Sequence, residues 1–191
     1  MEDSVQPATR AAWRAWLAKH HERTEGVWLI TYKKAAGKPR IEYHEAVEEA
    51  LCFGWVDSKP GKVDEERTKL WFAPRKARSG WSRPNKERVA RLIAADLMQP
   101  AGLARIEAAK QDGSWASLDA VEDLVVDADL AAALASYKNA AQNFEAFPRS
   151  AKRGILEWIA QAKRAQTRAA RIAETARLAQ DNLRANQWKP K

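Results

Sequence analysis

The sequence predicts an α+β protein with an N-terminal module, built on a small antiparallel sheet of about three strands, and a helical C-terminal region. Short β-branched and aromatic runs, which favour strands, alternate with amphipathic stretches in the first part of the chain. Beyond Pro74, apolar residues recur at helical spacing. We therefore expect three regions: an α+β module (1–73), a basic helical and loop connector packed on it (74–126), and a C-terminal helical region (127–191).

Five segments make up the predicted N-terminal module. An amphipathic helix is expected over residues 7–21, and Val27–Tyr32 is typical of a strand after Gly26. Apolar residues at helical spacing predict a second helix over residues 43–54. Two further strands are expected at 55–57 and 68–72, on either side of a charged turn.

The remainder of the chain is predicted to be helical. Ser82 or Arg83 is expected to cap a helix whose first turn contains Pro84, and a second helix covers 100–111. The C-terminal region is predicted to be a three-helix bundle. Its helices cover 130–147, where Asp127 is the expected N-cap, a segment that begins at Pro148 or Ser150, and a last segment that contains residues 169–183.

Composition and charge limit the class of protein. The chain carries one cysteine, Cys52, and a net charge of +8, and it has no apolar run of the roughly 20 residues that cross a bilayer. We expect a cytoplasmic protein without a secretory signal and without membrane insertion. Basic blocks at 74–110 and 148–191 flank an acidic block at 111–147, a pattern that favours either internal pairing or an anionic partner.

The first basic block contains the strongest candidate site. Cations, hydroxyl groups and one indole lie just before a predicted helix N-terminus, where an anion can be held. The alternative is a solvated helix face beside one core tryptophan. The candidate residues of this segment are Arg75, Lys76, Ser79, Trp81, Ser82 and Asn85.

The acidic face of the helix after Tyr43 is a weaker candidate. Glu45, Glu48, Glu49 and Cys52 share one side of this helix, and His44 lies four residues before Glu48. The HExxH spacing of zinc proteases is absent, and no complete catalytic signature is present. We therefore expect no metal, no cofactor and no catalytic residue, and we interpret Cys52 as a core residue.

The second basic block contains a possible arginine stripe. Arg164, Arg168 and Arg171 recur at helical spacing and would suit phosphate contacts. Pairing with the acids of residues 119–129 explains them equally well, and we favour that interpretation.

Three long segments resemble the YdeI/OmpD-associated family of bacteria, which is also called the bacteriocin-protection family. The resemblance runs in order from about residue 12 to residue 185. It is carried by GVWLITYKKAAGKPRIEYHEAVEEALCFGWVDS (26–58), WFAPRKARSGWSRPNKERV (71–89) and ILEWIAQAKRAQTRAARI (155–172). The family pattern includes Lys33, Lys34, Tyr43, Glu45, Glu49, Cys52, Gly54, Trp55, Asp57, Pro74, Arg75, Ser79, Trp81, Ser82, Asn85, Lys163, Arg164, Thr167, Arg168 and Arg171.

The resemblance implies an α+β module, a helical C-terminal region and a role in tolerance of bacteriocins or antimicrobial peptides. It implies either association with envelope proteins or a part in stress signalling, and an indirect link to the envelope suits the absence of a signal sequence better. Many family members have proline where this chain has Ala165. Without that proline, the sequence leaves open whether the last two helices are continuous or bent around Ala165.

These observations favour a non-enzymatic cytoplasmic binding protein. We expect the sheet and the 75–85 segment to form one cleft for a small anionic ligand or an acidic protein surface. The predicted N-terminal members of the cleft are Lys33, Lys34, Trp55 and Asp57. One alternative is an enzyme that uses Glu45, Glu49 or Asp57 as its acid–base residue in this cleft. Another is a nucleic-acid-binding protein that uses the two basic blocks, although no reader motif accompanies them.

Overall fold

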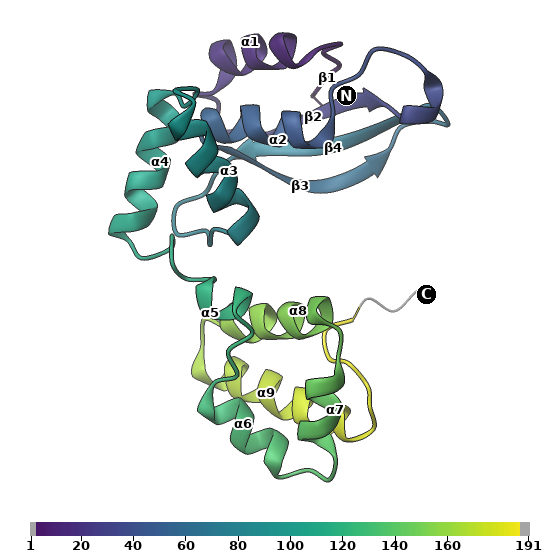
Figure 1. The fold of residues 1–191 in the computed structure, drawn as a ribbon, viewed down its shortest axis with the longest axis vertical. Coiled ribbons are helices and arrows are strands. Elements are labelled where there is room, and N and C mark those ends of the chain that lie inside the picture. Colours follow the sequence, from purple (N-terminus) through teal and green to yellow (C-terminus); the bar gives the residue numbers. More distant parts are fainter. Residues whose placement is uncertain (1–2, 188–191) are drawn as a thin grey trace. The chain divides into compact units, whose positions relative to one another are not determined.

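The computed structural model describes residues 3–187 and divides the chain into two compact units, Met1–Ser117 and Leu118–Lys191 (Figure 1). The N-terminal unit combines strands and helices, and the C-terminal unit is helical, so the α+β prediction is confirmed. The elements of the N-terminal unit are β1 (Ser4–Val5), α1 (Arg10–His20), β2 (Val27–Tyr32), the 3-10 turn η1 (Lys34–Ala36), α2 (Tyr43–Cys52), β3 (Trp55–Lys62), β4 (Arg67–Pro74), α3 (Arg83–Ala94) and α4 (Pro100–Gln111).

The sheet has four strands in the order β1-β2-β4-β3. The three predicted strands are antiparallel, whereas β1 is an additional strand that pairs with β2 in parallel, so the sheet is mixed. Val27 pairs with Phe72 and Trp55 pairs with Pro74, so the start of β2, the start of β3 and the end of β4 lie at one end of the sheet. The end of β2 and the β3–β4 hairpin turn lie at the other end.

One face of the sheet forms the core with helices α1 and α2. Val27, Leu29 and Phe72 alternate with less buried residues along their strands and are almost completely buried. Trp13 of α1 packs against Phe72, with ring centroids 5.4 Å apart, and its indole N–H donates to the carbonyl of Ala46 in α2 (3.1 Å). These contacts hold both helices on the sheet and bury apolar side chains between them.

Two glycines fix α4 against the corner between α2 and β3. Gly54 turns the chain at φ +76°, a conformation that suits glycine. Gly102 of α4 lies so close to this corner that an added Cβ would be 2.3 Å from the carbonyl oxygen of Cys52. The same carbonyl accepts the N–H of Gln99, just before α4 (3.1 Å). The position of α4 is therefore set by backbone contact.

The C-terminal unit has five helices among its described residues, and four of them lie within 127–191, where the sequence predicted three. They are α5 (Asp119–Glu122), α6 (Ala128–Ala135), α7 (Ala140–Ala146), α8 (Arg149–Ala160) and α9 (Ala165–Gln180). The predicted 130–147 helix is broken because Asn139 adopts a left-handed conformation (φ +61°) between α6 and α7. Buried side chains such as Leu130, Phe144, Ile155 and Ile172 form a separate core.

Helices α8 and α9 are separate, although residue 165 is alanine. Gln161 ends α8, and Arg164 is extended (φ −116°, ψ 139°) as the N-cap of α9. The extended backbone at Arg164 supplies a break without proline, so the two helices are not continuous. Among the described residues, no helix is both long enough and apolar enough to span a membrane.

Candidate functional site

Two neighbouring cavities lie in the N-terminal unit along one face of α4. The larger has a volume of about 350 Å³ and lies between α4, the end of α1 and the Gly54 corner. The smaller, of about 40 Å³, lies under the loop from Arg75 to Trp81. Arg105 and Ala108 line both cavities, so the two form one candidate site.

The sequence of α4 explains why space is left beside this helix. Ala101, Ala104, Arg105 and Ala108 recur at spacings of three and four, so they share one face and line the larger cavity. An adjacent side of the helix, which includes Gly102, Ile106 and Ala109, is buried in the core. Three short side chains around one long one leave a groove with a single cation in it.

Arg75 is the most unusual residue of the site, because its guanidinium is buried and only partly hydrogen-bonded. The residue is 6% exposed. One of its terminal nitrogens donates to the carbonyl of Gly80, but Nε has no hydrogen-bonding partner. Burial lowers the pKa of Arg75 to about 10, against the opposing attraction of Asp57. A buried cation with an unused donor is a favourable place for an anion.

A second residue that lines the same small cavity also has a buried polar atom without a partner. Ser114, in the turn after α4, is 6% exposed, and its hydroxyl makes no hydrogen bond. The turn is held by Asp112, whose carboxylate accepts the N–H of Ser114 (2.9 Å) and that of Arg78. The nearby Ser114 hydroxyl and these N–H groups lower the pKa of Asp112. The hydroxyl does not meet hydrogen-bond geometry with the Asp112 carboxylate or with any other group.

An indole pair forms the wall behind Arg75. The guanidinium carbon lies 3.8 Å from the ring centroid of Trp81, which is 1% exposed. Trp81 packs against Trp115 with centroids 5.0 Å apart, and Lys86 and Lys110 lie over the Trp115 ring. Stacking on Trp81 fixes the plane of the Arg75 guanidinium, which orients the unused Nε.

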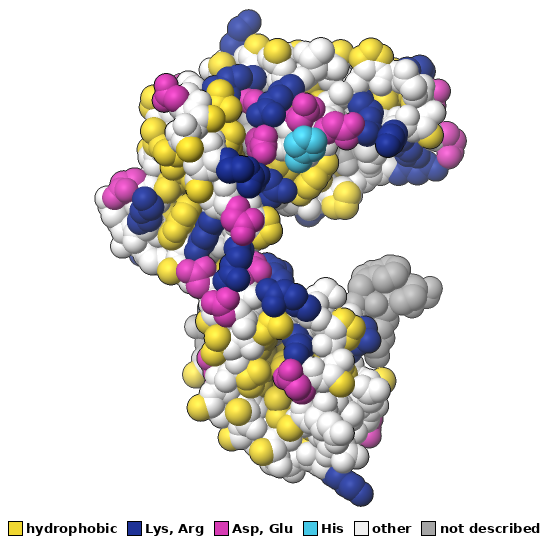
Figure 2. Space-filling view, viewed as in Figure 1, with side chains coloured by type: hydrophobic (Ala, Val, Ile, Leu, Met, Phe, Trp, Pro, Cys, Tyr) yellow, Lys and Arg dark blue, Asp and Glu magenta, His cyan; other side chains and the backbone are white. Residues whose placement is uncertain are grey.

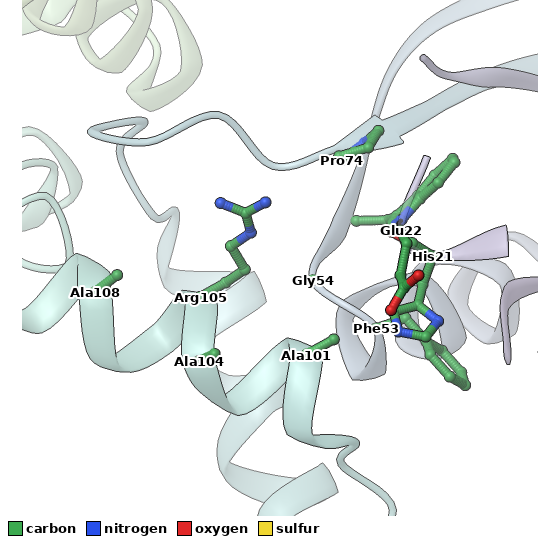
Figure 3. Close-up of a pocket in the computed structure, with 10 residues that line it drawn as sticks. His21, Glu22, Phe53, Gly54, Pro74, Ala101, Ala104, Arg105 and Ala108 are labelled. Atoms are coloured by element: carbon green, nitrogen blue, oxygen red, sulfur yellow. Dashed lines mark hydrogen bonds between the residues drawn. The ribbon is translucent and has the colours of Figure 1, made fainter. Parts of the chain in front are cut away.

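The larger cavity has a different chemical character. Figure 3 shows Arg105 rising from α4 into the space below Pro74, with His21, Glu22 and Phe53 gathered near Ala101. Trp55 also lines this cavity and donates its indole N–H to the carbonyl of His21 (3.1 Å). The cavity therefore joins an apolar wall to an acid at one end and a cation near its centre.

The structure brings five of the predicted site residues to the two cavities. Arg75, Lys76, Ser79 and Trp81 line the smaller cavity, and Trp55 lines the larger one. The Ser79 hydroxyl donates to the carbonyl of Lys76 (2.7 Å), so it first stabilises its own turn.

Two residues of the predicted segment are directed elsewhere. Ser82 occupies the N-cap position of α3, as predicted, but its side chain makes no capping hydrogen bond. The side-chain oxygen of Asn85 accepts from Arg88 (2.9 Å). Neither is among the residues that line the cavities.

The two predicted lysines lie at the opposite end of the sheet from Arg75. Lys33 follows β2 and donates to the carbonyls of Asp64 and Glu65 in the hairpin turn (3.3 and 2.8 Å), and Lys34 is next to it. Strand β4 separates this end from Arg75. The expected single cleft with Lys33 and Lys34 is therefore wrong. Neighbouring antiparallel strands run in opposite directions, so the C-terminal ends of β2 and β4 lie at opposite ends of the sheet.

Asp57 remains on the sheet. Its carboxylate accepts from the hydroxyl of Tyr43 (3.0 Å), and it does not belong to the cavity lining. The negative charge of Asp57 attracts the Arg75 guanidinium, and it partly offsets the lowering of the Arg75 pKa by burial.

The acidic face of α2 is a structural ion-pair network. Glu49, whose side chain is 4% exposed, binds Arg10 and Arg14 of α1 (both 2.6 Å), while the side chain of Glu45 accepts the N–H of Glu42 in a capping box. Figure 2 shows basic and acidic side chains interspersed over the helices of this unit.

Neither Cys52 nor a histidine forms a reactive centre with these acids. Cys52 is buried, and desolvation raises the pKa of its thiol, in agreement with a core role. Among the described residues, no three histidine, cysteine or acidic side chains are grouped to hold a metal ion.

Of the three arginines in the C-terminal stripe, Arg168 is the one that the described structure pairs with the acids of residues 119–129, as expected. Arg168 binds Asp129 (2.8 Å) and Asp127 (2.6 Å), and these bonds raise its pKa. Arg171 donates to the carbonyl of Trp158 and lies over that ring, with 5.0 Å from its guanidinium carbon to the centroid. Arg164 is exposed at the N-cap of α9.

Sequence reasoning missed five polar residues of the site that lie outside the 75–85 segment: His21, Glu22, Arg105, Asp112 and Ser114. Arg78 lies within that segment but was not among its candidate residues. The alanine spacing around Arg105 was a detectable pattern, because it gives α4 a face too small to pack closely. His21, Glu22 and Ser114 carry no local pattern, and only tertiary packing brings them to α4.

Comparison with known families divides the chain into two matches. A model described as "Domain of unknown function (DUF8412)" matches residues 5–105, which is more than half of the 191 residues. A model described as "Bacteriocin-protection, YdeI or OmpD-Associated" matches residues 123–182. No curated protein and no solved structure matches the chain significantly. The resemblance noted in the sequence is thus confirmed, and the chain belongs to the DUF8412 family and carries a bacteriocin-protection, YdeI or OmpD-associated domain in its C-terminal unit.

Proposed function

We propose that this protein is a non-enzymatic binding protein whose N-terminal unit holds a small anionic group beneath the 75–81 loop. The observation that carries the proposal is that Arg75 and Ser114, which each have a buried polar atom without a partner (Nε and Oγ), line the same small cavity. Leaving such groups unsatisfied costs free energy, and a bound oxyanion would accept from both. The cavity is large enough for a group of a few water-sized volumes.

The surroundings suit an anion better than a neutral ligand. Lys76, Arg78 and Arg105 line the same cavity, and Asp112 is the only acid in its described lining. The Asp112 carboxylate already accepts two backbone N–H groups, so part of its charge is compensated. The balance of charge around the cavity is therefore positive.

The match in the C-terminal unit connects this binding to a cellular role. We propose that the protein contributes to tolerance of bacteriocins or antimicrobial peptides by sensing an anion in the cytoplasm, with an indirect link to the envelope. The buried free thiol of Cys52 suits a reducing compartment. Survival of cells exposed to a cationic antimicrobial peptide, with wild-type or Arg75→Met protein, tests this part.

Titration calorimetry with acetate and with inorganic phosphate, at constant ionic strength, tests the binding itself. Arg75→Met keeps an unbranched side chain against Trp81 but removes the charge and the Nε donor. We expect it to weaken binding about tenfold or more, because a hydrogen bond to a charged group contributes roughly 1.5–3 kcal/mol. Its unfolding free energy should change by less than about 1 kcal/mol, because an unpaired buried charge is replaced by an apolar group.

Lys34→Gln is the matched control, because it removes one positive charge from the same unit at the far end of the sheet. It should bind both anions as the wild type does. Equal affinities of the wild type and Arg75→Met, or no anion binding above that of chloride, would contradict the proposal and would leave the two polar atoms to water.

A further inference from the structure

The larger cavity indicates which class of anion the site accepts. We infer that the ligand is a small zwitterion with an apolar body, whose anionic group is bound by Arg75 and whose ammonium group lies beside Glu22. This inference rests on the proposed function, since it takes Arg75 as the anion-binding end. It adds the size of the ligand and the nature of its other end.

The first argument is the continuity of the lining. Arg105 and Ala108 belong to both cavities, so a ligand bound at Arg75 has α4 beside it and the larger cavity next to it. A volume of about 350 Å³ is at the lower end of the range for small-molecule sites. The ligand is therefore larger than a bare phosphate or acetate ion.

The second argument is the apolar wall. Phe53, Trp55, Pro74 and the alanines of α4 line the larger cavity. Each methylene group that they cover contributes up to about 0.8 kcal/mol, which corresponds to roughly fourfold in affinity. The part of the ligand that lies against this wall is therefore hydrocarbon, aliphatic or aromatic.

The third argument is the charge at the far end. Figure 3 shows Glu22 near Ala101, on the far side of Arg105 from Ala108. Glu22 makes no ion pair with another described residue. A carboxylate at the open end of an apolar groove attracts an ammonium group, and the neighbouring ring of His21 can accept a hydrogen bond from it when neutral.

The length of the ligand follows from the helix. From Ala101 to Ala108 the axis of α4 rises about 10 Å, at 1.5 Å per residue. The charged groups of extended 8-aminooctanoate are also about 10 Å apart, and those of 4-aminobutyrate about half of that. We therefore expect affinity to rise from 4-aminobutyrate through 6-aminohexanoate to 8-aminooctanoate.

The experiment measures the affinities of this series, of octanoate and of acetate for four proteins by calorimetry: the wild type, Arg75→Met, Glu22→Gln and Glu25→Gln. Octanoate lacks the ammonium group of 8-aminooctanoate. In the wild type, the ratio of the two affinities therefore reports how much the contact between this group and Glu22 contributes. In Glu22→Gln this ratio should fall two- to fivefold, the size expected for an exposed ion pair of up to about 1 kcal/mol. Glu25→Gln removes an exposed acid three residues away that does not line the cavity, and it should leave the ratio unchanged.

The outcomes separate this inference from the proposal on which it rests. If acetate binds in an Arg75-dependent manner but the ratio is the same in Glu22→Gln, or affinity does not rise with length, the zwitterion is wrong and the anion site stands. If neither acetate nor any member of the series depends on Arg75, the anion site itself is wrong. A lower ratio in Glu22→Gln, combined with Arg75-dependent acetate binding, supports both.

Discussion

The loop from Arg75 to Trp81 and helix α9 are both rich in arginine, but the structure uses their charges differently. In α9, Arg168 donates to the carboxylates of Asp127 and Asp129, and its exposed side chain needs nothing more. Arg75 is almost completely buried, donates to one carbonyl and keeps an unused Nε. The difference shows that a high density of cations does not by itself indicate a site. Unused hydrogen-bonding capacity in a buried place does so more directly.

The largest expected effect comes from a substitution that tests how closely the backbone is packed in each unit. Gly102→Ala should destabilise the N-terminal unit by about 3 kcal/mol, since overpacking against a backbone carbonyl cannot be relieved by a rotamer change. It should also weaken acetate binding, because α4 must move away from the Gly54 corner. Thermal unfolding and calorimetry measure the two effects.

Gly154→Ala, in the middle of α8, is the matched control. An added Cβ at Gly154 would meet no atom within 4 Å, so the higher helix propensity of alanine should stabilise this unit by about 0.5–1 kcal/mol. Equal effects of the two substitutions would show that close packing at Gly102 does not set the position of α4.

A second test removes the paired arginine of the C-terminal unit. Arg168→Met should destabilise the protein by about 1 kcal/mol, the upper range for a surface ion pair, because two aspartates lose their partner. Arg164→Met, at the exposed N-cap of the same helix, should change stability by less than about 0.5 kcal/mol. A similar loss in both variants would mean that pairing with the aspartates is not the stabilising feature.

The stability difference between the wild type and Arg168→Met should depend on pH, because the ion pair stabilises the fold only while Asp129 is ionised. Hydrogen bonds from Arg168 lower the pKa of Asp129 below its ordinary value of 3.8. The stabilisation is therefore fully present above that value and is lost as the pH falls through the lowered pKa of the folded state. Denaturant unfolding should show a constant difference between wild type and Arg168→Met from about pH 5 to 8, and a shrinking one below about pH 4.

The smallest effects are expected from two buried hydroxyl groups. Thr175 of α9 is 1% exposed and donates to the carbonyl of Arg171 (2.8 Å), so Thr175→Val should cost about 0.5–1 kcal/mol. Ser114→Ala removes a hydroxyl without a partner, so the free protein should lose no stability while its acetate affinity falls. A clear loss of stability in Ser114→Ala would show that the hydroxyl is satisfied within the protein and is not available to a ligand.

Much of the fold could be predicted because its helices and strands have strong local patterns. The limits of β2 and α4 agree with the sequence to the residue, since glycine, proline and aspartate mark their ends. Strand β1 has only two residues, too few for an alternating pattern, and it forms by pairing with β2. The break at Asn139 depends on a single left-handed residue within an alanine-rich stretch.

The candidate site was harder to predict, because it depends on which strand ends meet. Lys33 and Arg75 are both cations that follow the last residue of a strand, but the antiparallel register places them at opposite ends of the sheet. The roles of Arg105 and Ser114 depend on the contact of Gly102 with Cys52, which sequence spacing does not reveal. Local patterns predicted the residues of the loop, and long-range packing selected those that share a cavity.

In α4, different residues meet two requirements: one set packs the core, and the alanines leave space beside the helix. Ile106 and Ala109 on one side of the helix maintain the core, while Ala101, Ala104 and Ala108 on the other side only limit the space beside it. A larger side chain at any of these three positions would shorten the groove and leave the core untouched. The size of the groove can therefore change at three positions while the residues that pack the core stay the same.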